Sequence, residues 1–328
     1  IKGSCASVKS LRQKLWNNIF TYDTKLYETH LWNRMEDFST LILGETGTGK
    51  GMAAAAIGRS GYIPFEVKKE RFKENFAKIF IAVNLSQFSE HLVESELFGH
   101  KKGAFTGAVD NHRGLFSRCS SCGAVFLDEI GEVSLPVQIK LLQVLQERNF
   151  SPVGSHDREK FSGRVIAATN SSLEDMRIQG KFREDFYYRL CSDTVNVPPL
   201  RERLKENRGE LKELIKVVLH RILGYSSREL TKELHQIIHN QLPKNYHWPG
   251  NIRELEQCVR QMLLNRSFSW NVRESSKDFQ QDFSHQYEKG DFTAHMLLSN
   301  YCIHLYNKFG SYEAVAKITD LDRRTVKK

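Results

Sequence analysis

The chain has 328 residues, of which 40% are hydrophobic and 27% charged, the balance of a globular protein with room for two or three domains. Its formal net charge of +9 favours an anionic partner such as a nucleotide or nucleic acid, although surface lysines alone also produce such a value. No stretch approaches the roughly eighteen apolar residues of a membrane span, and the first twenty residues lack the apolar centre of a signal peptide. The composition therefore excludes a membrane protein and predicts a cytoplasmic one.

A short apolar run at residues 40–43 leads into a glycine-rich loop and then into an alanine-rich helical segment. Strand, glycine loop and helix in this order predict a phosphate-binding loop, whose backbone N–H groups cradle phosphate oxygens while Lys50 supplies positive charge. Gly51 follows the lysine where such loops usually carry Ser or Thr, so the hydroxyl that commonly binds Mg²⁺ is missing. The predicted nucleotide-binding residues are Gly44, Glu45, Thr46, Gly47, Thr48, Gly49, Lys50 and Gly51.

An apolar hexapeptide with a glycine near each end follows further along the chain. Its glycines let the backbone turn sharply, and its phenylalanine has no apolar neighbours at strand or helix spacing. Two interpretations are open: a tight turn with a locally tucked ring, or an exposed tip that contacts a partner. The hexapeptide is Gly103, Ala104, Phe105, Thr106, Gly107 and Ala108.

Three more apolar runs, at residues 79–83, 124–127 and 165–168, each end in polar residues. With the helical stretch at 137–148 they predict an α/β fold, in which helices cover both faces of a parallel sheet. Side chains at the carboxyl ends of such strands form the usual binding site. These side chains are Asn84, Asp128, Glu129, Thr169 and Asn170.

The two acids offer one carboxylate for Mg²⁺, assigned to Asp128, and a second, on Glu129, to polarise an attacking water. The plainer alternative is two solvated acids at a strand end. Thr169 and Asn170 are candidates to sense the terminal phosphate or orient water, although asparagine after a strand is commonly only a turn residue.

Arginines in two later segments have a structural and a catalytic interpretation. Arg183 and Arg189 can pair with nearby acids on a helix surface, or can reach the nucleotide of a neighbouring subunit, which would require an oligomer. Arg253 lies near the start of a helix that opens at Trp248, where it can contact nucleotide from above or form a surface ion pair.

The spacing of apolar residues and the local composition divide the chain into four predicted segments. Residues 1–199 form the predicted α/β ATPase subdomain, 200–265 a small helical lid and 266–291 a polar linker. Residues 292–328 fit a helix-turn-helix, with Asp322 able to cap the second helix. Its candidate DNA contacts are Arg323, Arg324, Lys327 and Lys328.

With these motifs in order, the chain from about residue 40 to 265 resembles the AAA+ activators of sigma-54-dependent transcription, the NtrC-like bacterial enhancer-binding proteins. The resemblance implies ATP and Mg²⁺ as cofactors, with Asn84 as a switch that restrains Glu129, Thr169 and Asn170 as the first sensor, and Arg253 as the second. It implies that Arg183 and Arg189 are trans-acting arginine fingers of a ring, typically hexameric. It also implies that the 103–108 loop presses on the sigma-54 RNA polymerase holoenzyme, and that the terminal helix-turn-helix binds enhancer DNA.

The chain departs from the family pattern at Gly51, where the family often has glutamate, and in two insertions, at residues 22–38 and 66–78. The second insertion is rich in Lys, Arg and Phe, and an amphipathic helix is favoured there over a nucleic-acid contact. The absence of an initial methionine and the resemblance predict an amino-terminal sensory domain outside the sequence, in a bacterial cytoplasmic protein. Two other functions stay open: a DNA-binding regulator that uses ATP only for assembly, and an AAA+ remodeller outside transcription.

Overall fold

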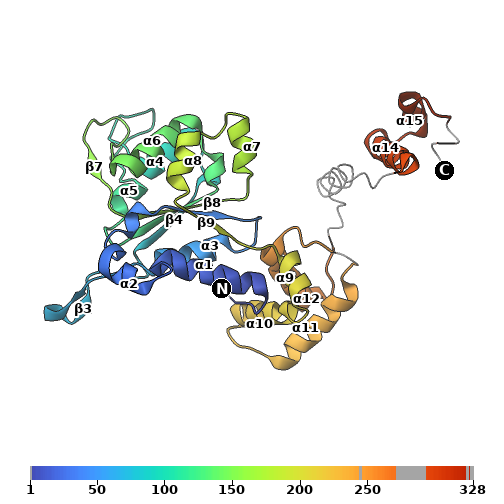
Figure 1. Cartoon of the computed structure of the whole chain (residues 1–328), viewed down its shortest axis with the longest axis horizontal. Helices are drawn as coiled ribbons and strands as arrows, with labels where there is room; N and C mark the ends of the chain where they lie inside the picture. Colours follow the sequence, from blue (N-terminus) through green and yellow to red (C-terminus); the bar gives the residue numbers. More distant parts are fainter. Residues whose placement is uncertain (1, 244–245, 271–292, 323–324, 326–328) are drawn as a thin grey trace. The chain divides into compact units, whose positions relative to one another are not determined.

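A computed structural model describes residues 2–243, 246–270, 293–322 and 325, and the chain divides into two compact units, Ile1–Ser269 and Trp270–Lys328. Figure 1 shows a sheet with helices on both sides in the first unit, followed by a cluster of helices. Within these described ranges, no helix combines the length and apolar character needed to cross a membrane.

The sheet has five parallel strands in the order β4-β5-β8-β1-β9. Four of them match the predicted apolar runs, and they are β1 (Thr40–Leu43), β4 (Phe80–Asn84), β5 (Ala124–Asp128) and β8 (Arg164–Thr169). Sequence inspection missed the edge strand β9 (Asp193–Asn196), because Val195 is its one apolar residue. The α/β prediction is confirmed.

Alternate residues of the central strands face two separate cores, as the period of two in a strand requires. Val125 and Leu127 of β5 pack into one core, while Ala124 and Phe126 pack into the other. The first face is covered by α4 (Glu90–Phe98), α5 (Leu115–Arg118), α6 (Leu135–Glu147), α7 (Leu173–Ile178) and α8 (Glu184–Leu190). The second is covered by α1 (Ala6–Phe20) and α3 (Lys50–Gly58).

A helical lid follows the sheet within the first unit. Its helices are amphipathic, and the faces with apolar residues at helical spacing are buried. They are α9 (Leu200–Glu206), α10 (Glu210–Leu223), α11 (Arg228–Gln241) and α12 (Asn251–Asn265). The lid begins with α9, which follows β9 after the short connection Val197-Pro198-Pro199. The strand and the lid are therefore joined by a short, proline-containing segment.

The first insertion forms short helical turns: α2 (Thr24–Leu26), η1 (Tyr27–Leu31) and η2 (Met35–Asp37). Arg164, a buried residue at the start of β8, donates a hydrogen bond to the carbonyl of Phe38 at 3.1 Å and so ties the insertion to the sheet.

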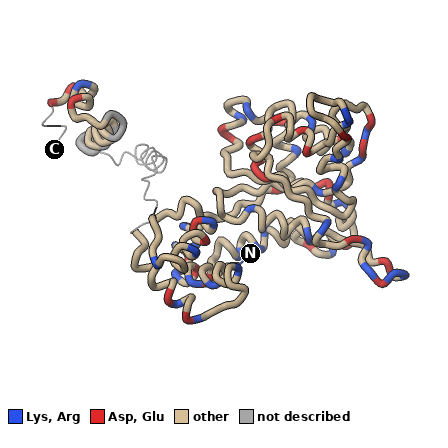
Figure 2. The backbone as a smooth tube through the Cα atoms, turned by 180° about the vertical axis from the view of Figure 1, so that it is seen from behind, with Lys and Arg blue, Asp and Glu red and all other residues tan. Residues whose placement is uncertain are grey.

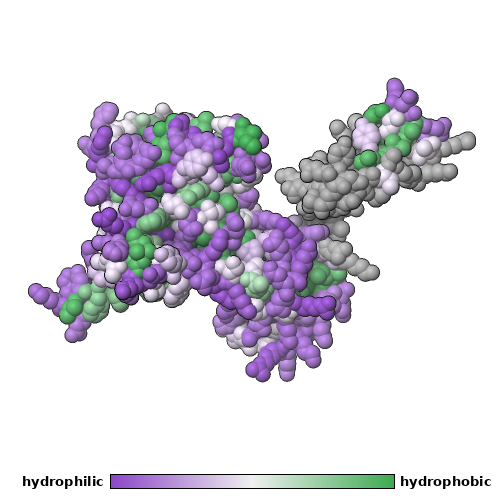
Figure 3. All heavy atoms as spheres, in the orientation of Figure 1, coloured by the Kyte–Doolittle hydropathy of each residue, from purple (hydrophilic) through white to green (hydrophobic). Residues whose placement is uncertain are grey.

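The second insertion is a hairpin, and the helix favoured from its sequence is wrong. Strands β2 (Phe65–Glu66) and β3 (Arg71–Phe72) pair antiparallel across the turn η3 (Val67–Lys69). Phe65 and Phe72 face one another across the strands, with ring centroids 5.2 Å apart, and are 50% and 60% exposed. The hairpin projects from the sheet in Figure 1, carries both charge signs in Figure 2 and shows apolar atoms at its end in Figure 3.

The second unit contains helices α14 (Ala294–Phe309) and α15 (Tyr312–Thr319). Val315 is buried, and the backbone turns into the left-handed region at Asp320 after α15. Most of the predicted linker and all four proposed DNA contacts lie outside the described residues; those contacts are Arg323, Arg324, Lys327 and Lys328.

Candidate nucleotide site

The glycine loop joins the carboxyl end of β1 to the first turn of α3, as its sequence predicts. Gly47 and Gly49 have φ of +79° and +105°, in the left-handed region that favours glycine. The buried Lys50 side chain folds back over the loop, and its ammonium donates to the carbonyl of Gly44 at 2.9 Å. A loop held this way leaves its backbone N–H groups at a helix N-terminus, which fits a chain of phosphates.

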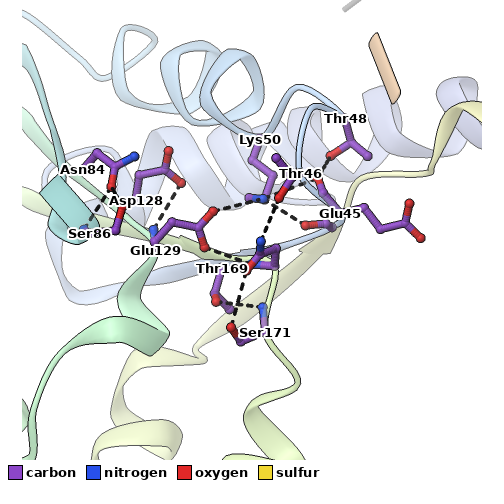
Figure 4. Close-up of polar contacts among 12 residues, drawn as sticks. Glu45, Thr46, Thr48, Lys50, Asn84, Ser86, Asp128, Glu129, Thr169 and Ser171 are labelled. Carbon is purple, nitrogen blue, oxygen red and sulfur yellow. Dashed lines mark hydrogen bonds and ion pairs between the residues drawn. The ribbon is translucent and has the colours of Figure 1, made fainter. Parts of the chain in front are cut away.

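Glu129 faces the loop from the end of β5, which β8 separates from β1 in the sheet. Its carboxylate lies 3.7 Å from the ammonium of Lys50 (Figure 4). It also accepts a hydrogen bond from the backbone N–H of Asn170 at 3.2 Å. The Asn170 amide in turn donates to the Thr46 hydroxyl at 2.7 Å. Four predicted site residues, two from the loop and one from the end of each of two strands, therefore meet at one place.

Asp128 lies beside this group at the end of β5. Burial, helped by the adjacent Glu129 carboxylate, raises the pKa of Asp128 above its usual value, while Lys50 and Arg253 partly offset the effect. A nearby cation stabilises the ionised form of such a partly buried carboxylate more than it stabilises an exposed one. The Asp128 carboxylate thus offers the kind of oxygen ligand that Mg²⁺ prefers, and it fits the ion that the sequence assigns to it.

Asn84 and Thr169 are engaged elsewhere. The amide oxygen of Asn84 accepts from the N–H and the hydroxyl of Ser86, at 3.0 and 2.7 Å, instead of engaging Glu129. Thr169 is 1% exposed, and its hydroxyl oxygen accepts from the N–H of Ser171 (Figure 4). Of the predicted Thr169-Asn170 sensor, the asparagine is the member that contacts the loop.

The two candidate trans-acting arginines contact their own surroundings on α6 and α8. Arg183 pairs with Asp185 through two hydrogen bonds, of 3.0 and 2.6 Å, and its side chain is 39% exposed. Arg189 donates to the carbonyl of Leu145. Arg183 can leave Asp185 for another partner at a small cost in free energy, because water solvates both exposed charges when the pair opens.

The lid contacts the loop directly through the start of α12. The N–H of Ile252 donates to the carbonyl of Gly47 at 3.0 Å, and a Cβ on Gly47 would lie 2.2 Å from the carbonyl oxygen of Gly250. Arg253, next in the helix, is exposed, lies over Gly47, and interacts electrostatically with Asp128.

Sequence reasoning missed two residues that hold the loop from the lid side. Arg201 and Asn251 both donate hydrogen bonds to the Glu45 carboxylate, the former through two nitrogens. The sequence did contain a signal for these contacts, because Glu45 places a negative charge in a loop that binds anions. Such a carboxylate is expected to pair with a cationic or amide side chain.

The 103–108 loop follows α4, and the N–H of Lys101 just before it donates to the carbonyl of Val153 at 3.1 Å. It closes with a hydrogen bond from the N–H of Gly103 to the carbonyl of Ala108, at 2.8 Å, while a Cβ on either Gly103 or Gly107 would meet open space. Phe105 is 37% exposed, and its ring lies edge-on to His100 with centroids 4.9 Å apart. The ring is therefore partly tucked and partly presented to solvent, between the two interpretations drawn from the sequence.

The sigma-54 interaction domain family matches residues 24–196, and the AAA+ ATPase lid domain family matches residues 205–290. The chain belongs to the sigma-54 interaction domain family. The AAA+ sigma-54 interaction domain, an ATPase fold, therefore spans the loop, the two acids and the 103–108 hexapeptide.

Curated relatives of this sigma-54 interaction domain are transcriptional regulators. The chain is 42% identical over 233 residues to the Nif-specific regulatory protein of Azotobacter vinelandii, an alignment covering 71% of this chain and 40% of that protein. It is 44% identical over 226 residues to the sigma54-dependent transcriptional activator SfnR of Pseudomonas putida, covering 69% and 57% of the two chains. The chain thus spans about half or less of the length of these relatives.

Among solved structures, NtrX from Brucella abortus in complex with ATP is similar, with a TM-score of 0.57 at 22% identity, covering 99% of this chain and 67% of that one. At this identity the likeness shows the fold alone. It agrees with a parallel sheet followed by a helical lid.

Proposed function

We propose that this sigma-54 interaction domain hydrolyses ATP and uses the cycle to remodel the sigma-54 RNA polymerase holoenzyme through residues 103–108. The observation that carries the proposal is the meeting of Lys50, Glu129 and Asn170 at a glycine loop, in a chain that also carries this hexapeptide. Hydrolysis needs a phosphate cradle, a base and a polar group that positions water, and these residues supply them.

In the proposed reaction, the loop N–H groups and Lys50 bind the phosphates. Asp128 would hold Mg²⁺, which neutralises charge on the terminal phosphate oxygens when bound. Glu129 takes the proton of the attacking water once its carboxylate has left Lys50. Asn170, already in contact with both the loop and Glu129, orients the water.

The proposed reaction also needs a neighbouring subunit. Arg183 and Arg189 would leave their present partners and stabilise charge on the phosphate of an adjacent subunit, which requires a ring, proposed to be hexameric. The exposed position of the Arg183–Asp185 pair supports this exchange for Arg183.

Coupling to transcription is proposed through Phe105 and Thr106, with Phe105 partly exposed at the end of a loop closed on itself. The switch role of Asn84, the sensor roles of Thr169 and Arg253, DNA binding by residues 292–328 and a bacterial cytoplasmic location stay part of the proposal. The domain limits 1–199, 200–265 and 266–291 also stay proposals.

The test is the ATPase rate per subunit, measured against protein concentration with and without sigma-54. We expect the specific rate to rise with concentration and to change when sigma factor binds. A rate per subunit that does not change with concentration would remove the trans-acting arginines. An absence of hydrolysis would favour a regulator that uses ATP only for assembly. Hydrolysis with no response to sigma-54 would favour a remodeller outside transcription.

A further inference from the structure

The Glu45 side chain points away from the phosphate-binding side of its own loop (Figure 4). Its two carboxylate oxygens accept hydrogen bonds from both terminal nitrogens of Arg201, at 2.8 and 2.6 Å. Arg201 belongs to the first turn of α9, so the pair joins the nucleotide loop to the start of the lid. Paired bonds between a guanidinium and a carboxylate are among the strongest and most directional in proteins.

Asn251 completes the connection at the first residue of α12. Its amide nitrogen donates to the Glu45 carboxylate and to the carbonyl of Thr46, both at 3.1 Å, and its amide oxygen accepts from the N–H of Leu200 at 2.7 Å. The side chain is fully buried, with φ of +52°, a conformation that asparagine tolerates better than most residues. One amide therefore joins the loop to the beginnings of two lid helices.

The backbone of Glu45 is fixed as well as its side chain. Its carbonyl accepts from the N–H of Thr48 at 3.3 Å and from the Thr48 hydroxyl at 2.8 Å, and lies 3.4 Å from the Lys50 ammonium. Holding the Glu45 side chain therefore also holds the turn that aims the loop N–H groups and Lys50.

We propose that Glu45, Arg201 and Asn251 form a loop clamp: positioning residues through which the lid keeps the loop in its phosphate-binding shape. Nucleotide affinity then depends on the position of the lid, even where Arg253 is not involved. This inference rests on the proposed nucleotide binding. Because a preformed loop favours bound ATP and bound ADP alike, opening the clamp weakens binding of both and leaves the chemical step nearly unchanged.

The test uses the whole chain and a fluorescent ADP analogue, whose binding does not require hydrolysis. Arg201→Gln should raise the Kd of the analogue about tenfold and the KM for ATP similarly, with kcat within about twofold of the unaltered chain. Arg221→Gln is the matched control, because it opens an arginine–glutamate pair inside the lid, in which the half-exposed Arg221 lies 3.1 Å from Glu256. The control should bind the analogue normally.

A double-substitution cycle separates a clamp from independent contacts. Glu45→Gln should weaken binding at least as much as Arg201→Gln, and the combined variant should bind no worse than Glu45→Gln alone. Multiplied effects, or a fall in kcat with KM unchanged, would overturn the clamp. If the unaltered chain fails to bind the analogue, the proposed function fails first; if it binds and Arg201→Gln binds equally well, only the clamp is wrong.

Discussion

The carboxylate of Glu129 lies 3.7 Å from the ammonium of Lys50, while Asn84 is occupied by Ser86. The proposed base is thus paired with the same positive charge that would receive the phosphates. A triphosphate, which carries more negative charge than one carboxylate, competes for Lys50 and releases Glu129 at the moment when a base is needed. Pairing of this kind keeps the base occupied in the absence of nucleotide, without help from Asn84.

Glu129→Gln should lower the ATPase rate by about 100-fold or more, since an amide cannot accept the proton of water at neutral pH. Binding of ATP should stay intact or tighten, because the substitution removes a negative charge beside the phosphates and frees Lys50. Glu132→Gln is the control, as Glu132 is an exposed residue in the next turn. Rates and affinities come from steady-state hydrolysis and a fluorescent-nucleotide titration. Normal turnover by Glu129→Gln would remove this residue as the base.

Asp128 should make stability depend on pH in a defined direction. Because burial and Glu129 raise its pKa in the folded chain, the folded state binds the Asp128 proton more tightly than the unfolded state does. The ionised group therefore costs stability above the folded pKa, and the cost disappears as pH falls below the unfolded value near 3.9. Asp128→Asn should raise the melting temperature at pH 7 without nucleotide, and the gain should shrink toward pH 4. A gain that grows on acidification would contradict the assignment.

Phe105→Ala should abolish transcription activation while hydrolysis stays within about twofold, because the residue contacts His100 and solvent rather than the nucleotide loop. Val109→Ala is the control, since Val109 is 70% exposed and lies just beyond the hexapeptide. The measurements are ATPase rate and sigma-54-dependent open-complex formation. Activation that survives in Phe105→Ala would place the contact elsewhere.

The sequence predicted the strands that carry the chemistry, because Ala124–Asp128 and its neighbours are continuous apolar runs ending in acids or amides. It could not predict β9, which forms because it pairs with β1 and not because of its own composition. The prediction of a helix where the hairpin lies was wrong for a related reason. Residues 65–73 combine mostly charged side chains with a phenylalanine near each end, a pattern that fits either a helix face or a short hairpin. The Phe65–Phe72 contact that favours the hairpin exists only once the strands have paired.

Within the site, sequence order placed Asp128, Glu129 and Asn170 correctly at strand ends, since parallel strands bring their carboxyl ends together. Sequence order could not predict which side chains contact one another. The contact between Glu129 and Lys50 depends on side-chain conformation, and the clamp depends on Asn251, which is about 200 residues from Glu45 along the chain.

Two glycines of α3 should respond oppositely to alanine. At Gly51, in the first turn, an added Cβ would lie 3.9 Å from the Phe126 ring, an ordinary contact, so Gly51→Ala should stabilise the chain by roughly 0.5 kcal/mol through the lower entropy of its unfolded state. At Gly58 the Cβ would lie 2.3 Å from the Phe80 ring and 3.1 Å from the Ala124 Cβ. Gly58→Ala should therefore cost about 1–3 kcal/mol, because it overpacks the core between α3 and the sheet.

Urea unfolding of both variants measures the two changes on one scale, and the matched substitution cancels the shared effect of alanine on helix propensity. Gly51→Ala should also retain ATP hydrolysis, since no side chain at this position is needed to hold the loop in its described shape. Equal stabilisation by both substitutions would mean that Phe80 moves aside at little cost and that α3 is not held tightly against β4 and β5. Loss of hydrolysis in Gly51→Ala alone would mean that the open space beside Lys50 is required for the nucleotide.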